Sequence, residues 1–219
     1  MESFFENFPE TVFVTGTGTD VGKSFATGWM AKRLLEKGEK VITQKLVQTG
    51  NKTESEDIEL HRRIMGIPMT PHDKLHVTAP IIFTYPCSPH LAARLDGREL
   101  DLKMADEATD VLTKSYDKVL IEGAGGVMVP LHERYLTLDF IIDRKLPAIV
   151  VVGGELGSIN HALLTLELMR LKGVEIYGVV YNPWFDKDKI IASETRDYLH
   201  RWTEDFLPGT KFVVMPRFA

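Results

Sequence analysis

The chain has 219 residues, 44% of them hydrophobic, which is enough to bury a sizeable core as one α/β domain. Its 26 basic and 31 acidic residues give a formal net charge of -5 without a basic block, which argues against nucleic acid as a partner. The single cysteine, Cys87, excludes an intrachain disulfide and a cysteine-based metal cage. Because we find neither a signal pattern nor an apolar stretch of membrane-spanning length, we predict one domain over residues 1–219, located in the cytoplasm and without membrane contact.

Short β-branched runs alternate with longer amphipathic segments along the chain. The pattern predicts strands over 11–15, 40–47, 81–84, 118–122, 148–153, 176–182 and 211–215. It predicts helices over 25–37, 54–65, 101–115, 137–144, 158–172 and 188–205. Several of the strands are apolar on both faces, as buried parallel strands are. The sequence therefore predicts a parallel sheet of about seven strands with helices on both faces.

A glycine-rich turn, Gly16-Thr-Gly-Thr-Asp-Val-Gly22-Lys23-Ser24, connects the first predicted strand to the first predicted helix. Such a turn directs backbone N–H groups and the positive end of a helix dipole at one point, where an anion can bind. Lys23 adds a charge for outer phosphates, and the Ser24 hydroxyl can join the coordination shell of Mg²⁺. The strict phosphate-loop pattern requires glycine in place of Thr17, and a dinucleotide fingerprint requires glycine in place of Val21. We interpret the turn as a variant phosphate loop.

Ligands of parallel α/β sheets bind outside the carboxyl ends of the strands, so the residues that follow each strand form one candidate set. Glu122 ends an otherwise apolar strand, and burying an unpaired carboxylate there would be costly. Gly157 opens a second glycine-rich turn into a helix, which is another anion-binding terminus. The strand-end segments are Lys45-Leu-Val-Gln-Thr49-Gly50, Glu122-Gly-Ala-Gly-Gly126, Gly153-Gly-Glu-Leu-Gly157-Ser-Ile-Asn160-His161, Asn182-Pro183 and Pro216-Arg217-Phe218.

Taken together in this order, the motifs closely resemble those of the dethiobiotin synthetase family. The matching segments are Val14 to Ser24, Lys45 with Thr49-Gly50, Asp57, Ser88-Pro89-His90, Val119 to Gly126, Gly157 to His161, Asn182 and Pro216. The resemblance implies a phosphate-loop NTPase-like fold and a Mg²⁺- and ATP-dependent cyclo-ligase. That enzyme joins CO2 to 7,8-diaminononanoate, phosphorylates the carbamate and closes the ureido ring, releasing ADP and phosphate, with CO2 or bicarbonate as the carbon source.

The resemblance also assigns roles to residues. Lys45 would face the carbamate and Lys23 the transferring phosphoryl group, with Thr19 and Thr49 holding the carbamate and diamine end. The metal ligands would be Ser24, Asp57 and Glu122, whose hard oxygens suit Mg²⁺. Nucleotide-binding residues would be Asp20, Val21, Gly22, Lys23, Ser24, Phe25, Asp57, Glu122, Gly123, Ala124, Gly125, Asn182, Pro183, Pro216, Arg217 and Phe218. Substrate-binding residues would be Thr49, Ser88, Gly157, Ser158, Ile159 and Asn160, the last four acting across the interface of a homodimer.

Two other functions remain open at this point. One is another phosphate-loop amidating or kinase-like enzyme, although the chain has no room for the glutaminase domain that amidating relatives carry. The other is a partitioning-type regulatory ATPase, which usually has a further lysine early in its phosphate loop, where this chain has Thr17-Gly18-Thr19. Lys45 could also be a solvated strand-end lysine, and Asp57 could simply favour a helix N-terminus.

Overall fold

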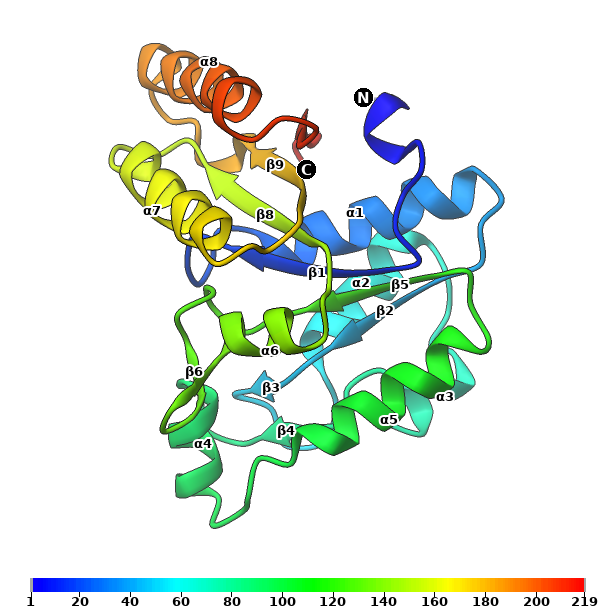
Figure 1. Cartoon of the computed structure of the whole chain (residues 1–219). Coiled ribbons are helices and arrows are strands. Elements are labelled where there is room, and N and C mark those ends of the chain that lie inside the picture. The colour runs from blue at the N-terminus through cyan, green and yellow to red at the C-terminus, as the bar shows by residue number, and fades with distance from the viewer. Residues whose placement is uncertain (1, 219) are drawn as a thin grey trace.

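The structure, a computed structural model, describes residues 2–218 and is built around a six-stranded parallel sheet (Figure 1). The strand order is β10-β9-β8-β1-β5-β2. This confirms the predicted α/β class with a parallel sheet. The strands are β1 (Thr11–Gly16), β2 (Val41–Lys45), β5 (Lys118–Glu122), β8 (Ala148–Gly153), β9 (Ile176–Asn182) and β10 (Lys211–Val214).

Helices cover both faces of the sheet because its strands are apolar on both sides. On β1, Phe13 belongs to one buried cluster, whereas Val12 and Val14 belong to the other. The first cluster packs under α5 (Leu102–Thr113), α6 (Thr137–Asp143), α7 (Ser158–Leu171) and α8 (Lys189–Phe206). The second packs under the 3-10 helix η1 (Glu2–Phe5), α1 (Lys23–Glu36) and α2 (Glu56–Met65).

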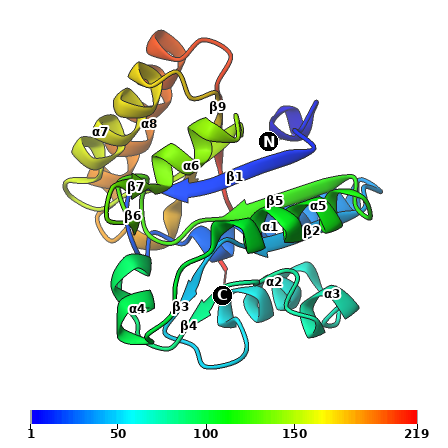
Figure 2. The ribbon, with the colours of Figure 1, turned by 60° about the horizontal axis from the view of Figure 1, so that its bottom comes forward.

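The main sheet has six strands because the segment predicted over 81–84 pairs elsewhere. Only Ile82–Phe83 forms a strand, β4, and it pairs in parallel with β3 (Gln48–Thr49). Beyond Lys45 the chain leaves the edge of the main sheet. The segment before β4 runs beside the end of β2, where Lys45 N donates to Thr78 O at 2.7 Å. Figure 2 shows β3, β4 and α4 (Pro89–Leu95) grouped on the side of the molecule away from α7 and α8.

Several short elements were not predicted, although two of them have sequence signals. The one-turn helix α3 (Pro71–Lys74) begins with a capping box in which Thr70 and Asp73 exchange hydrogen bonds. In α4, Ser88 is the N-cap and Pro89 the first helical residue, which is a favoured position for proline. The hairpin of β6 (Pro130–His132) and β7 (Tyr135–Leu136) and the 3-10 helix η2 (Pro183–Phe185) are too short for a periodic pattern.

The strand order determines where a ligand can bind. From β1 the chain reaches the edge strand β2, returns to place β5 between them, and then continues on the other side of β1 with β8. The order reverses at β1, and crevices for ligands form at such switch points. The loop after β1 therefore lies at the centre of the carboxyl edge. Among residues 2–218, no helix is long and apolar enough to cross a membrane.

Candidate functional site

The loop between β1 and α1 has the backbone geometry of an anion-binding turn. Gly22 is the N-cap of α1 with φ of 90°, a left-handed conformation that favours glycine. A Cβ atom at Gly22 would lie 2.2 Å from Asn182 Nδ2, so a larger residue would also collide there. Within residues 2–218 no side chain caps α1, which leaves the N–H groups of its first turn available to a ligand. Lys23 Nζ donates to Gly18 O at 2.8 Å, within the same loop.

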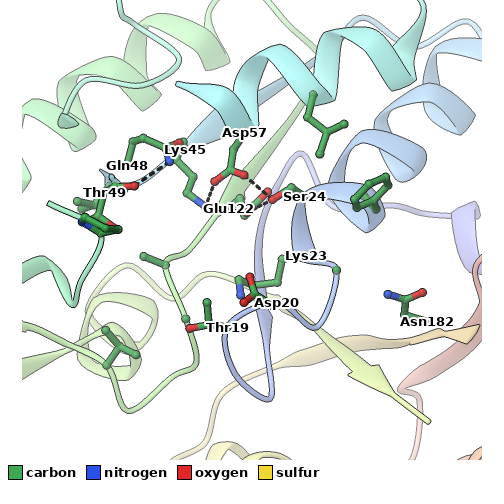
Figure 3. Close-up of a pocket in the computed structure, with 18 of the residues that line it drawn as sticks. Thr19, Asp20, Lys23, Ser24, Lys45, Gln48, Thr49, Asp57, Glu122 and Asn182 are labelled. Atoms are coloured by element: carbon green, nitrogen blue, oxygen red, sulfur yellow. Dashed lines mark hydrogen bonds and ion pairs between the residues drawn. The ribbon is translucent and has the colours of Figure 1, made fainter. Parts of the chain in front are cut away.

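A cleft of about 870 Å³ opens at this edge of the sheet. Figure 3 shows Thr49 and Gln48 on one side of the cleft, Asn182 on the other, and Lys23 and Ser24 between them. The structure brings together in this cleft most of the residues that the sequence pointed to. These are Thr19, Asp20, Gly22, Lys23, Ser24, Phe25, Lys45, Thr49, Asp57, Ser88, Glu122, Ala124, Gly125, Asn182 and Phe218.

Lys45, Asp57 and Glu122 form one group of charged side chains at the cleft. Lys45 Nζ lies 2.5 Å from Asp57 Oδ2 and 2.7 Å from Glu122 Oε1. Glu122 has no exposed surface, and the side chain of Lys45 is only 5% exposed. The group draws on three elements, since Lys45 ends β2, Glu122 ends β5 and Asp57 lies in the first turn of α2. A lysine this buried and this closely paired is not a solvated strand-end residue.

The pKa values of these groups reflect burial and mutual charge. Burial alone would raise the pKa of Glu122, but the charge of Lys45 and the hydrogen bond from His61 outweigh it and lower the pKa well below its usual range. Burial would lower the pKa of Lys45, yet the charges of Glu122 and Asp57 raise it above its ordinary value. Burial lowers the pKa of Lys23, and the charge of Lys45 adds to that decrease. Glu122 and Lys45 are therefore both charged at neutral pH.

Three hard oxygen groups meet beside Lys23. Ser24 Oγ lies 2.7 Å from Asp57 Oδ1 and 2.8 Å from Glu122 Oε1, although its single proton can serve only one of them at a time. Within residues 2–218, no group of three or more histidine, cysteine, aspartate and glutamate side chains is arranged to hold a metal ion. One hydroxyl and two carboxylates nevertheless fit Mg²⁺, which usually takes one or two carboxylates and completes its shell with phosphate oxygens and water.

Asn182 occupies the opposite side of the cleft, where its amide already has two partners. Its Nδ2 donates to Val21 O at 2.9 Å, and its Oδ1 accepts from Trp184 N at 3.0 Å. The side chain thus ties the phosphate loop to the end of β9. Phe25 and Phe218 lie nearby as an aromatic pair with centroids 5.6 Å apart.

Some residues named by the sequence do not line this cleft. Val21, Gly123, Pro183, Pro216 and Arg217 are next to lining residues and contribute backbone or anchoring contacts. For example, Arg217 Nε donates to Pro183 O at 3.1 Å. Gly157, Ser158, Ile159 and Asn160 lie apart from the cleft, at the start of α7. Within one chain, this second glycine-rich turn therefore contributes nothing to the site.

Other lining residues were given no role by the sequence analysis, although Val47, Gln48 and Pro89 lie in segments that it named. They are Val47, Gln48, Leu60, Pro86, Cys87, Pro89, Val129, Trp184, Phe185 and Met215. Trp184 comes just after Asn182-Pro183 at the end of β9, so the strand-end rule could have found it. The apolar residues carry no chemical signal that distinguishes them from core.

A variant phosphate loop at the switch point of a parallel sheet defines a phosphate-loop nucleotide-binding domain. The fold comparison agrees with this class. A ParA family ATPase from Chlorobium tepidum TLS superposes with a TM-score of 0.54 at 14% identity, over 96% of this chain and 86% of that one. At this identity the likeness concerns the fold alone.

Sequence comparison gives the family. A family model described as an AAA domain matches residues 10–205. The ATP-dependent dethiobiotin synthetase BioD 2 of Pasteurella multocida is 47% identical over 93% of this chain and 95% of its own length. Its counterpart in Haemophilus ducreyi is 44% identical over 94% of this chain and 98% of its own length. The chain belongs to the ATP-dependent dethiobiotin synthetase family of ligases, as its motifs predicted.

Proposed function

We propose that this protein closes the ureido ring of dethiobiotin from 7,8-diaminononanoate, CO2 and ATP, by way of a carbamate and its phosphorylated form. The observation that carries the proposal is the division of one cleft. A phosphate loop and Lys45 lie at its centre, with the hydroxyl-bearing Thr49 on the side away from Asn182. Ser88, a second hydroxyl-bearing residue, also lines the cleft. Family membership supports the reaction class, and this division supports separate positions for the nucleotide and the diamine.

The reaction gathers negative charge around one carbon, so catalysis needs fixed cations and N–H dipoles more than a nucleophile. Lys45 would stabilise the carbamate oxygens and Lys23 the transferring phosphoryl group. Thr19 and Thr49 would hold the carbamate and the diamine. Ser24, Asp57 and Glu122 would hold Mg²⁺, which when bound would neutralise charge on the terminal phosphates.

The test is product formation. Purified protein supplied with Mg²⁺, ATP, bicarbonate and 7,8-diaminononanoate should form dethiobiotin, identified by mass spectrometry. Release of ADP should require both bicarbonate and the diamine. The proposal is wrong if ATP turns over equally without the diamine and no ureido product appears.

We also propose a homodimer in which the start of α7 contributes to the partner's substrate pocket. Leu156 is 88% exposed beside Gly157, and Leu164 and Leu171, seven residues apart on α7, are 64% and 69% exposed. Large apolar side chains exposed to solvent on a helix and in the turn before it are typical of an interface. The position of Gly157 to Asn160 outside their own chain's cleft supports the same arrangement.

Complementation between two inactive variants tests the shared site. Asn160 is exposed, so Asn160→Trp should fold normally yet block the partner's pocket. Mixing this variant with Lys45→Ala should restore activity, because one of the two sites in each hybrid dimer then has both intact parts. Lys114→Trp, an exposed position at the end of α5, is the matched bulky control and should be active alone. No recovery despite demonstrated subunit exchange would mean that each site is built within one chain.

A further inference from the structure

On its buried side, Glu122 contacts a histidine that the sequence analysis did not single out. His61 Nε2 lies 2.7 Å from Glu122 Oε2, and neither side chain has any exposed surface. The other oxygen, Oε1, faces Lys45 Nζ at 2.7 Å and Ser24 Oγ at 2.8 Å. The two oxygens of this carboxylate thus have separate partners, one in the interior and one at the cleft.

The position of His61 follows from helix and strand periodicity. Asp57 and His61 are four residues apart on α2, so both side chains lie on the same face of the helix. Thr43 and Lys45 are two residues apart on β2 and share one face of the strand. Each element therefore presents one residue to the cleft and one to the interior beside it, where Thr43 Oγ1 lies 2.9 Å from His61 Nδ1.

The hydrogen bonds assign the imidazole tautomer. Arg62 can only donate, and its Nη1 lies 2.7 Å from Thr43 Oγ1, so this hydroxyl accepts from Arg62. The hydroxyl proton is then free to point at His61 Nδ1. The imidazole carries its own proton on Nε2 and donates it to Glu122 Oε2. A proton on Nδ1 would instead leave the Thr43 hydroxyl proton without a partner among the described residues.

Arg62, the first donor in this series of hydrogen bonds, is itself held in place. Arg62 Nε and Nη2 hold the two oxygens of Asp73 at 2.8 and 2.7 Å, and Arg62 is 2% exposed. A two-point contact between a guanidinium and a carboxylate restricts the direction of both groups. Arg62 therefore fixes the Thr43 hydroxyl, which fixes the His61 ring, and the ring in turn fixes the Glu122 carboxylate.

We propose that His61 is a positioning residue, which holds Glu122 Oε2 so that Oε1 alone is presented to the phosphate loop. The terminal torsion of a glutamate is broad, so without a partner on Oε2 the carboxylate could rotate and engage Lys45 with both oxygens. The inference rests on the proposed metal-binding role of Glu122. Donors that orient a ligating carboxylate in this way typically change metal affinity by about 10–100-fold when they are removed.

Two amide substitutions separate this role from a general structural one. The glutamine of His61→Gln can place its NH2 group near the position of Nε2 and still donate to Glu122. The shorter side chain of His61→Asn reaches only the position of Nδ1, near Thr43. The probe is Mn²⁺, titrated by electron paramagnetic resonance in the presence of a non-hydrolysable ATP analogue, with thermal unfolding of each variant as the folding control.

We expect His61→Asn to weaken Mn²⁺ binding by about 10–100-fold and His61→Gln to stay close to wild type. Equal affinities in the two variants would overturn the positioning role. If neither variant folds, Thr43→Val, which removes the partner of Nδ1, should weaken Mn²⁺ binding in the same direction, and unchanged affinity there would overturn the role as well.

Glu122→Gln distinguishes failure of this inference from failure of the proposed site. If Glu122→Gln weakens Mn²⁺ binding but His61→Asn does not, only the role of His61 is wrong. If Glu122→Gln has no effect on Mn²⁺ affinity, the metal site and the inference that rests on it are both wrong. Absence of dethiobiotin as a product would leave the Mn²⁺ measurements unaffected, because they use no diamine.

Discussion

Two groups of opposite charges each include a residue of α2, and they differ in whether a ligand can reach them. In the first, Arg62 and Asp73 are 2% and 3% exposed, and protein groups fill their hydrogen bonds. In the second, Lys45 and Glu122 meet Asp57, whose side chain is 24% exposed and lines the cleft. A closed ion pair, which is surrounded by protein, can affect only stability and geometry. An open group, which borders the cleft, can also interact with a bound ligand.

The largest effect should come from breaking the closed pair. Arg62→Met leaves the Asp73 carboxylate buried without its cation, and loss of one partner of a buried ion pair typically costs about 3–5 kcal/mol of stability. Urea unfolding at neutral pH measures this loss. The double variant Arg62→Met/Asp73→Asn should be more stable than Arg62→Met alone, because a neutral amide is less costly to bury. If the two are equally stable, the ion pair does not account for the loss.

Breaking the open group should act on turnover rather than on the fold. Lys45→Ala should lower kcat about a hundredfold, or about 3 kcal/mol, by analogy with removal of one preorganised oxyanion donor. Because Asp57 is partly exposed to the cleft, the free energy of unfolding should fall less than in Arg62→Met.

Lys45→Arg is the matched control, and it should restore turnover only in part because a planar fork does not replace a compact point charge. Steady-state kinetics, with ATP titration alongside, measure both variants. Near-normal turnover in Lys45→Ala would move the catalytic role to Lys23 and the loop amides.

The smallest expected effect is a loss of stability at acid pH, caused by protonation of Asp73. Burial would raise the pKa of Asp73, but the hydrogen bonds and charge of Arg62 outweigh it and lower the pKa to about 2. A carboxyl with a lowered folded pKa stabilises the protein above its unfolded value of about 3.9 and loses that contribution as pH falls toward the folded value.

The stability difference between wild type and Asp73→Asn should therefore shrink by about 2 kcal/mol between pH 5 and pH 2. Denaturant unfolding across that range measures the difference. A constant difference would show that Arg62 does not depress the pKa of Asp73 in the folded protein.

The open group was accessible from the sequence and the closed pair was not. Glu122 and Lys45 end strands, and the ends of parallel strands share one edge, so their convergence follows from the strand pattern alone. Asp73 lies in a one-turn helix that is too short to show periodicity, and its partner Arg62 looks like a solvated helix residue in the sequence. His61 had a detectable signal, its four-residue spacing from Asp57, but which side of α2 faces β2 is decided only by packing.

The fold was predicted to a similar degree. All six strands of the main sheet were found, because buried apolar runs between helices are distinctive. The pairing of Ile82–Phe83 with β3 was not, since two paired residues leave no pattern and the pairing partner is set by where the chain bends after Lys45. The roles of the cleft residues stay predictions until the variants are measured.

Gly22 and Asn182 are far apart in the sequence but close in space, so the side chain allowed at one position depends on the residue at the other. A methyl group at position 22 would meet the Asn182 amide at 2.2 Å, and that amide supports the loop through Val21 O. Any side chain at position 22 would also need a backbone with φ of 90°. A smaller residue at position 182 could relieve the first conflict but would remove the support. Across descendants of this gene, the two positions should therefore change together or not at all, with glycine at 22 setting the limit.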